Sequence, residues 1–566
     1  MKISMKIGMT GVLIAGLLAG SCDSYFDVPT DDMLEASDNY QERETVYAGL
    51  IGLATVFREV AEHHVVLSEL LGDLMQPTTN APDACWDVYR FKADNGNEFA
   101  SPRPYYTLVV NCNDFLRNVI TYNRNYPGTL GDNVYRGLIA TALTYRAWAY
   151  LQLGKLFGEA VYYDISFVDN NGVFPQRVLK LDELVEELIY NLKNGVEGVN
   201  AFQTLDWKTV IAPMEDNFDQ MWNHVSIDAN VLLTELYLWA RDYTNAVKTG
   251  LNFLSAAGDN YKLTVWRGDN KDRQWFKMFT GNFGGDHLKE ICTLAPFDFE
   301  RGQTGKLQYY FSNESPNVYY FQPHMNQLRR FSSQASRMSV PSEPGEKPTL
   351  LRTTDEQRLA GSVKYKNGHY TIAKYSHERK NYEQDAPVYI YRAPELYLMV
   401  AEALSGLGGS NNIAAADSII NVGFQSSWVN GHFEQPFEAP IYTSVFNKCP
   451  GVRRRVVIGG DYIRYHVDTL AFPDKTEEQK LLRQQREKFV LDSLICEETA
   501  LELAYEGKRW FTLLRIARNT GRPELLAKQV AAKFDAGESQ VYERWLMDPQ
   551  NWFIKWDQQA VKKGEN

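Results

Sequence analysis

The sequence has few cysteines and lacks the short motifs of common enzymes. Its 566 residues include six cysteines, and none of them are spaced as CxxC. A disulfide framework or a zinc site is therefore not indicated, and the five cysteines after Cys22 are predicted to be isolated buried thiols. Strings of the HExxH, GxSxG and Walker types are also missing. We therefore predict no enzyme activity, no catalytic residue and no cofactor, although a hydrolase that uses two distant carboxylates stays open.

The sequence also lacks a cluster of positive charge. The formal net charge is -12, and no stripe of lysine and arginine reverses it locally. A surface of this kind repels phosphate backbones, so nucleic acid is not expected as a partner, and anionic ligands are disfavoured. Neutral ligands remain compatible with this composition.

Long apolar runs are missing except for one near the start. Lys2 and Lys6 precede an apolar stretch from Ile7 to Leu18, which is shorter than the roughly 20 residues that span a bilayer. The small-residue string LAGSC then ends at Cys22. This order predicts a signal peptide over residues 1–21 and an acylated Cys22 that anchors the chain to a membrane through a polar tether, residues 22–40. An ordinary secretory signal with an incidental cysteine is the alternative.

Helical periodicity dominates the first half of the chain. Apolar residues recur at spacings of three and four, and Gly158 is well placed to end the clearest of these segments. The predicted helices cover Val46 to Leu74, Tyr106 to Ile120, Asn133 to Phe157 and Asp182 to Leu192.

Two segments are similar to the helix pairs of tetratricopeptide repeats. They are Ser226 to Leu254 and Tyr391 to Asn421, and about 150 residues separate them, whereas such repeats normally follow one another directly. We therefore predict a long insertion, about 262–388, that is rich in glycine, asparagine and aromatic residues and includes the strand-like runs EICTLAPF and VYIY. Loops on a rigid frame often carry binding sites.

The C-terminal third contains a charged helix, Glu477 to Leu494, and then the string CEETALELAYEGKRWFTLLR. Helical spacing predicts that Glu502 and Glu506 reach Lys508 or Arg509 across one turn. The same spacing predicts that three apolar side chains face inward: Leu503, Trp510 and Leu514.

An unusually aromatic segment, YYFSNESPNVYYF, lies inside the predicted insertion at residues 309–321. Two short arms, Tyr309 to Phe311 and Val318 to Phe321, flank turn-forming residues and suggest a hairpin. Because strand side chains alternate between faces, at least one ring in each arm is expected to point away from the core. The outward rings are predicted to be Tyr310 and Tyr320.

Several strings together resemble the SusD/RagB family of outer-membrane nutrient-binding lipoproteins. They are SCDSYFDVPT, TYRAWAYLQLGKLFGEAVYY, RAPELYLMVAEAL and ELAYEGKRWFTLLR, in an order that extends over nearly the whole chain. Two positions depart from the family pattern: Thr512 stands where an aspartate is common, and INVGF at residues 420–424 replaces the usual INxVR-like ending. Both departures lie on scaffold helices and bear on packing.

The resemblance implies a mainly α-helical fold of tetratricopeptide-like helix pairs with a loop-rich half that contains short strands. A single domain, 41–566, would comprise a scaffold of about 41–260 and 389–425, the insertion, and a C-terminal region, 426–566. The resemblance also implies a lipid-anchored protein on the outer face of the outer membrane. Such a protein captures oligosaccharides and delivers them to a SusC-like TonB-dependent transporter. Peptide capture, as in RagB-like proteins, and a purely structural lid on the transporter are the alternatives.

Sugar binding needs aromatic planes for the apolar face of a sugar ring and polar groups for its hydroxyls. Two regions interleave such residues, Asn80 to Arg90 and Gly302 to Arg330, and the resemblance places binding loops in comparable positions. The predicted stacking residues are Trp86, Tyr89, Tyr310 and Tyr320, and the predicted polar partners are Asp83, Asn317 and Arg329. Packing in the core is the alternative for each ring.

Metal binding is not predicted. Glu59, His63 and His64 have helical spacing for a metal, but no third ligand follows nearby, so solvated or core histidines are favoured. The string DNGNE at residues 94–98 lacks the full calcium-loop register and is interpreted as a polar turn.

Overall fold

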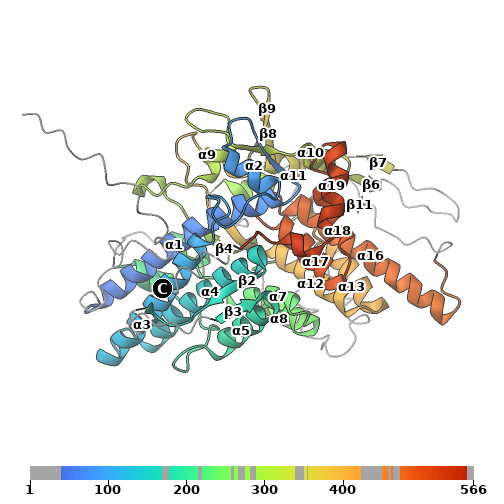
Figure 1. The fold of residues 1–566 in the computed structure, drawn as a ribbon. Helices are drawn as coiled ribbons and strands as arrows, with labels where there is room; N and C mark the ends of the chain where they lie inside the picture. The colour runs from blue at the N-terminus through green and yellow to red at the C-terminus, as the bar shows by residue number, and fades with distance from the viewer. Residues whose placement is uncertain are drawn as a thin grey trace, which may run out of the picture.

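The structure is a computed structural model that consists mainly of α-helices (Figure 1). It describes residues 40–167, 177–213, 219–256, 260–265, 275–280, 289–337, 350–352, 355–421, 423, 449–456, 461–462 and 472–556. Cys22 and the predicted signal peptide lie outside these residues. In the described part of the chain, no helix combines the length and the apolar character needed to cross a bilayer.

The predicted helices of the first half are confirmed. They are α1 (Arg43–Leu71), α3 (Arg103–Asn125), α4 (Asp132–Phe157) and α5 (Leu181–Asn194), and α4 packs against both α3 and α5. Gly158 ends α4 as expected, because its φ of 80° is favourable for glycine and its N–H donates to the Gly154 carbonyl.

The two helix pairs that resemble tetratricopeptide repeats are also confirmed. The first is α7 (Ala229–Trp239) with α8 (Tyr243–Ala256), and the second is α12 (Ala393–Leu407) with α13 (Ser410–Asn421). Although they are far apart in the sequence, α8 packs directly on α12. Gly250 permits this close approach, since a Cβ there would lie 2.7 Å from Val400 Cγ2. The residues between the pairs therefore leave the helical stack and return to it.

The C-terminal helices are α16 (Glu477–Glu502), α17 (Arg509–Thr520), α18 (Glu524–Ala531) and α19 (Ala536–Leu546). The chain turns between α16 and α17, where Gly507 has a φ of 74°. A Cβ on Gly507 would lie 3.2 Å from Val65 Cα of α1, so this turn fits closely against α1. Leu503, Trp510 and Leu514 are buried, which confirms their predicted inward orientation.

The predicted ion pairs within this turn are wrong. Because the helix breaks before Lys508, the two glutamates point toward the base of the insertion. Glu502 and Glu506 bind Arg392 at 3.1 and 2.7 Å, and Lys374 also binds Glu506 at 2.6 Å. Lys508 instead pairs with Glu395 at 3.0 Å, and Arg509 pairs with Asp73 at 2.6 Å. Buried ion pairs between distant segments thus connect the insertion and α1 to the C-terminal helices.

The strands are short, as predicted. In antiparallel two-stranded sheets, β1 (Met75–Pro77) pairs with β5 (Phe321–Pro323), β2 (Glu159–Tyr162) with β3 (Arg177–Lys180), β4 (Ile291–Ala295) with β10 (Val388–Arg392), and β8 (Val363–Lys366) with β9 (His369–Ile372). A three-stranded sheet has the order β11 (Asp461–Tyr462), β6 (Ala335–Arg337), β7 (Leu350–Arg352). The runs EICTLAPF and VYIY correspond to β4 and β10, so both strand predictions are confirmed.

The remaining elements are short helices. The α-helices are α2 (Asp83–Tyr89), α6 (Trp207–Ile211), α9 (Leu307–Phe311), α10 (Met325–Ser332) and α11 (Glu356–Ser362). The 3-10 helices are η3 (Gln220–His224), η5 (Trp275–Phe279), η7 (Phe299–Arg301), η8 (Arg454–Val456) and η9 (Pro549–Trp552). In Figure 1, α2, α9, α10, α11 and the β8–β9 hairpin gather at the top of the view, above the long helices.

The hydrophobic core extends from α1 through the helix pairs to α19. A smaller apolar cluster lies at the base of the insertion and includes Trp275, Phe279 and Tyr389. The five cysteines after Cys22 are free and buried, as predicted: Cys85, Cys112, Cys292, Cys449 and Cys496.

The predicted hairpin over residues 309–321 is wrong. Tyr309, Tyr310 and Phe311 belong to helix α9, and Phe321 begins strand β5, which pairs with β1. One backbone hydrogen bond, from Val318 N–H to the Tyr309 carbonyl, joins the two arms. A three-residue aromatic run has no periodicity of its own, so tertiary contacts decide its conformation.

Candidate functional site

An open cleft of about 400 Å³ lies between one face of α1 and residues 297–310 of the insertion. Two aromatic rings from the insertion, Phe297 and Tyr310, and a third, Phe99, form its apolar wall. The other lining residues are mostly polar: Arg58, Glu59, Glu62, His63, Val66, Glu98, Thr304 and Lys306. The volume falls in the range of about 300–1,000 Å³ that is typical of small-molecule sites.

The α1 side of the cleft follows from helical geometry. Arg58, Glu62 and Val66 are four residues apart and therefore lie along one face, with Glu59 and His63 beside them. His63 Nε2 lies 3.1 Å from the Ser101 carbonyl oxygen, and burial lowers the pKa of His63 to about 4. The imidazole is therefore neutral near pH 7.

A tight turn of the insertion forms the opposite side. The Asp298 carboxylate accepts from Glu300 N–H, Gly302 has a φ of 70°, and a short β-bridge joins Asp298 to Gln303. Arg58 then connects α1 to this turn, because its guanidinium donates to Gln303 Oε1 at 2.8 Å and lies 4.9 Å from the Phe297 ring centroid.

Glu62 fixes the start of α9. Its carboxylate accepts the backbone N–H groups of Lys306 at 2.6 Å and Leu307 at 3.1 Å, which have no partner within the helix. Gly305 makes this approach possible, since a Cβ there would lie 2.5 Å from Glu62 Oε1. Burial raises the pKa of Glu62 to about 7, against the lowering effect of these hydrogen bonds. Glu62 thus holds Tyr310, on the same short helix, against the cleft.

Tyr310 presents a half-buried ring to the cleft. The ring stacks on Tyr320, with centroids 5.3 Å apart and an interplanar angle of 14°, and meets Phe99 and Phe321 edge-on. Burial raises the pKa of Tyr310 to about 12, so its hydroxyl stays protonated and can donate a hydrogen bond.

Tyr320 supports Tyr310 from behind. The segment 318–320 is held by the loop after β1: Thr78 N–H donates to the Tyr320 carbonyl, Thr78 Oγ1 donates to the Tyr319 carbonyl, and Asn80 Nδ2 donates to the Val318 carbonyl. The structure thus brings two of the predicted stacking residues together, but Tyr310 is the one that lines the cleft.

The two predicted polar partners from the same region lie elsewhere. The Asn317 side chain donates to the carbonyls of Glu314 and Asn381 and accepts from Gln384 Nε2, so its amide holds loops together. Arg329 is exposed on α10, where its guanidinium lies 3.5 Å from Asn326 Oδ1.

The remaining predicted site residues are on α2. Asp83 is exposed in the first turn, and Trp86 is half-buried with the Arg90 guanidinium 4.9 Å from its ring centroid. Tyr89 is 5% exposed; its hydroxyl donates to the Lys533 carbonyl, and the Lys533 ammonium lies 4.4 Å from its ring centroid. We therefore leave Tyr89 out of the proposed site, because its ring has no accessible face.

A second cleft, about 470 Å³, lies on the other side of the 298–303 turn. Its rim carries the exposed rings of Phe299 and Tyr382, whose centroids are 5.7 Å apart. The two cations that line it are paired, Arg379 with Asp385 at 2.9 Å and Lys380 with Glu383 at 3.3 Å.

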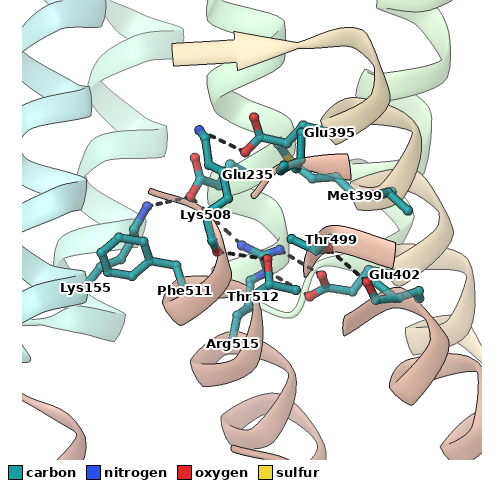
Figure 2. Close-up of a pocket in the computed structure, with 13 residues that line it drawn as sticks. Lys155, Glu235, Glu395, Met399, Glu402, Thr499, Lys508, Phe511, Thr512 and Arg515 are labelled. Atoms are coloured by element: carbon teal, nitrogen blue, oxygen red, sulfur yellow. Dashed lines mark hydrogen bonds and ion pairs between the residues drawn. The ribbon is translucent and has the colours of Figure 1, made fainter. Parts of the chain in front are cut away.

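A third, buried cavity between α4, α7, α12 and α17 is too small for a sugar. Figure 2 shows that charged side chains fill it: Lys155 pairs with Glu235, Lys508 with Glu395, and Arg515 with Glu402. The remaining space, about 20 Å³, suffices for about one water molecule. Thr512 adds a hydroxyl here, and three cations face three carboxylates.

The residues that suggested a metal do not form a site. His64 Nδ1 lies 3.1 Å from the Tyr105 hydroxyl, and the His64 ring stacks on Phe511 in the core. Within the described ranges, no three His, Cys, Asp or Glu side chains are placed to hold a metal ion together.

Of the residues that line the first cleft, sequence reasoning named only Tyr310 as a binding residue. Those that it missed include Arg58, Glu62, Phe297 and Lys306. The spacing of Arg58 and Glu62 indicates a shared helix face, but a sequence does not show which part of that face a distant loop leaves uncovered. Their role depends on contacts across 244 and 245 positions of the chain.

The chain thus combines helix pairs of the tetratricopeptide type with an inserted, loop-rich face that carries an aromatic cleft. The sequence model of the SusD family matches residues 250–422, which extend from α8 through the insertion to α13. No curated protein sequence is significantly similar to the chain.

Solved structures share the fold over nearly the full length. A SusD superfamily protein from Bacteroides vulgatus has a TM-score of 0.60 at 14% identity, covering 92% of this chain and 97% of its own. A SusD homolog from Bacteroides thetaiotaomicron has a TM-score of 0.58 at 17% identity, with 93% and 96% covered. Surface glycan-binding protein A from Bacteroides fluxus has a TM-score of 0.54 at 14% identity, with 88% and 94% covered. The chain therefore has the fold of SusD superfamily proteins, and its residues 250–422 match the SusD family in sequence.

Proposed function

We propose that this chain is a cell-surface glycan-binding lipoprotein that captures oligosaccharides in the cleft beside Tyr310. An acylated Cys22 anchors the chain to the outer membrane. There it delivers the oligosaccharides to a SusC-like TonB-dependent transporter. It performs no catalysis. The match of residues 250–422 to the SusD family model supports this role, and a structural neighbour from Bacteroides fluxus is itself named a surface glycan-binding protein.

The observation that carries the proposal is the pairing of an aromatic wall with a polar helix face across one cleft. The apolar face of a sugar ring stacks on the Tyr310 ring, which Tyr320 and Phe99 hold in place. The hydroxyls at the edge of the sugar then meet donors and acceptors from Arg58, Glu59 and Thr304.

The other predicted residues have supporting or separate roles in this proposal. Tyr320 fixes the plane of Tyr310, and Asn317 fixes the loop that leads to Tyr320. Trp86 and Asp83, on α2, are a second contact for a longer saccharide.

Titration calorimetry with a panel of neutral oligosaccharides, including glucans, xylans, mannans and galactans, tests the proposal. We expect at least one to bind. Tyr310→Ala should weaken that binding about tenfold or more, because about 1.4 kcal/mol of stacking is removed. The matched control is Tyr190→Ala, which removes a tyrosine that is 63% exposed on α5, and it should bind as the wild type does.

The proposal is contradicted if no saccharide of the panel binds, or if Tyr310→Ala binds as tightly as the wild type. Binding of peptides from a protein digest in place of sugars would favour the peptide-capturing alternative. In that case main-chain hydrogen bonds and side-chain pockets would replace ring stacking.

A further inference from the structure

Most of the buried arginines among the described residues bind a carboxylate, and the half-buried Arg58 departs from that pattern. Arg392, Arg455, Arg509 and Arg515 each bind at least one carboxylate. By contrast, no carboxylate of the described residues lies within 4.0 Å of the Arg58 guanidinium, which is half-buried at the cleft. A half-buried cation without a counter-ion loses part of its hydration, and no attraction to a carboxylate offsets that loss.

Two of the three guanidinium nitrogens of Arg58 form no hydrogen bond with the described residues. One terminal nitrogen donates to the neutral Gln303 side chain, and the Phe297 ring lies against the guanidinium. The Nε–H is buried and has no hydrogen-bond partner. Consistent with this, burial lowers the pKa of Arg58, and Glu59 and Glu62 compensate only in part.

A second cation of the cleft is also unpaired. Lys306 is exposed, and its ammonium forms no ion pair with the part of the chain that the structure describes. Its backbone N–H binds Glu62, so the residue is fixed while its side chain remains free. Arg58 and Lys306 come from the two opposite sides of the cleft, one from α1 and one from the start of α9.

The acidic groups that face the cleft do not cancel these cations. Glu59 and Glu98 are exposed, so water and salt screen their charge. Glu62 is buried, and with a pKa of about 7 it carries only part of a negative charge near neutral pH. His63 is neutral there. Water screens the half-buried guanidinium less than it screens the exposed charges of the cleft. Arg58 is therefore the group that would attract an anionic ligand most strongly.

We infer that the cleft selects acidic saccharides, with Arg58 binding the carboxylate of a hexuronate residue while Tyr310 stacks on its ring and Lys306 adds attraction. This inference rests on the proposed function and names the class of sugar that the same site takes. A guanidinium fork matches a carboxylate in shape and charge. The site thus departs locally from the net charge of -12, which by itself disfavours anionic ligands.

The experiment compares uronate oligosaccharides with the same molecules after methyl esterification, which removes the charge and keeps the sugar. Oligomers of galacturonate, glucuronate, mannuronate and guluronate, each with its ester, are titrated into the purified protein. We expect the best-bound acid to bind about tenfold or more tightly than its ester, which is the effect of one charged hydrogen bond. Raising the salt concentration should reduce this preference.

Two variants assign the preference to this cleft. Arg58→Gln should bring acid and ester to within about twofold of each other, whereas Arg58→Lys, which keeps the charge but not the fork, should retain part of the preference. Lys306→Gln changes an exposed residue and should lower the preference for the acid over its ester several-fold. This variant tests the inference if Arg58→Gln does not fold. Circular dichroism and thermal unfolding verify the fold of each variant.

The possible outcomes separate this inference from the proposed function. If neutral oligosaccharides bind and no acid binds better than its ester, the inference is wrong and the proposed function stands. If the acid is preferred but Arg58→Gln keeps the preference, the carboxylate binds elsewhere and the inference is also wrong. If neither acidic nor neutral saccharides bind, the proposed function itself fails.

Discussion

Two charged regions of the molecule differ in whether their cations have partners. In the buried cavity between α4, α7, α12 and α17, three basic side chains each pair with a glutamate (Figure 2). In the open cleft beside Tyr310, Arg58 and Lys306 have no such partner among the described residues. Complete pairing indicates a group that stabilises the fold, and incomplete pairing in a cleft indicates a group that is available to a ligand.

The two regions also differ in the pKa of a buried glutamate, Glu235 in the cavity and Glu62 at the cleft. Burial opposes ionisation of both, but attraction to Lys155, Lys508 and Arg515 outweighs it at Glu235 and holds the pKa of that carboxyl well below its usual range. Glu62 has hydrogen bonds but no ion pair, and burial raises its pKa to about 7. The environment, and not burial alone, therefore decides the charge that each carboxyl carries.

The largest expected effect comes from removing one arginine from each region. Arg515→Met leaves Glu402 buried without its two hydrogen bonds of 2.8 Å, and should lower the free energy of unfolding by about 3–5 kcal/mol. Arg58→Met removes a cation that has no carboxylate partner and keeps an apolar stem against Phe297. It should change stability by less than about 1 kcal/mol. Urea unfolding measures both.

Arg136→Met is the control for Arg515→Met, since Arg136 forms an exposed pair with Asp132 and should contribute less than about 1 kcal/mol. If Arg58→Met destabilises the protein as much as Arg515→Met does, the distinction between the two regions is lost.

The next effect is on the pH dependence of stability. The pKa of Glu62 in the folded protein, about 7, lies above its unfolded value of about 4.5. The folded state therefore binds more protons, and the free energy of unfolding falls as the pH rises from about 4.5 to about 7, by at most about 3 kcal/mol. Glu235 has the opposite sign: its stabilisation is present above about pH 4.5 and is lost as the pH falls.

Unfolding midpoints between pH 3 and pH 8 measure this difference. Glu62→Gln should flatten the profile between about pH 4.5 and 7, and Glu235→Gln should flatten it below about pH 4.5. Equal changes in both variants over one pH window would argue against different environments for the two carboxyls.

A smaller effect is expected from a methyl group at the back of the cleft. In Gly305→Ala, the new Cβ would lie 2.5 Å from Glu62 Oε1, so the carboxylate must move and weaken its bonds to Lys306 and Leu307. We expect a loss of about 1–3 kcal/mol in stability and weaker saccharide binding, because Tyr310 lies on the same helix. Gly52→Ala is the control, since its Cβ would meet nothing within 4 Å on α1, and it should be neutral or stabilising by up to about 1 kcal/mol. Equal stability of the two variants would show that Glu62 adjusts without cost.

The helical scaffold could be predicted from the sequence because its signals are local. Apolar spacing predicted α4 and Gly158 predicted its end, and the helix pair α7–α8 was likewise visible in the sequence. The packing of α8 on α12 was not, because it depends on Gly250 meeting Val400 on a helix about 150 residues away. The strand prediction for Tyr309 to Phe311 failed for a similar reason, since Glu62 of α1 fixes that short helix from 245 positions away.

The candidate site was predictable in part. Interleaved aromatic and amide residues pointed to Tyr310 and Tyr320, which the structure stacks on one another. Asn317 was predicted on the same grounds, but its side-chain amide forms hydrogen bonds with the surrounding loops. The sequence does not indicate that Arg58 lacks a carboxylate partner, because the fold decides which charged side chains come close to one another.

A crystal structure of the protein with a bound oligosaccharide tests the central claim most directly. We expect one sugar ring to lie against the Tyr310 ring, with polar groups of the saccharide within hydrogen-bond distance of the Arg58 guanidinium. A saccharide bound instead at the rim formed by Phe299 and Tyr382, or at Trp86 alone with the Tyr310 cleft empty, would contradict it.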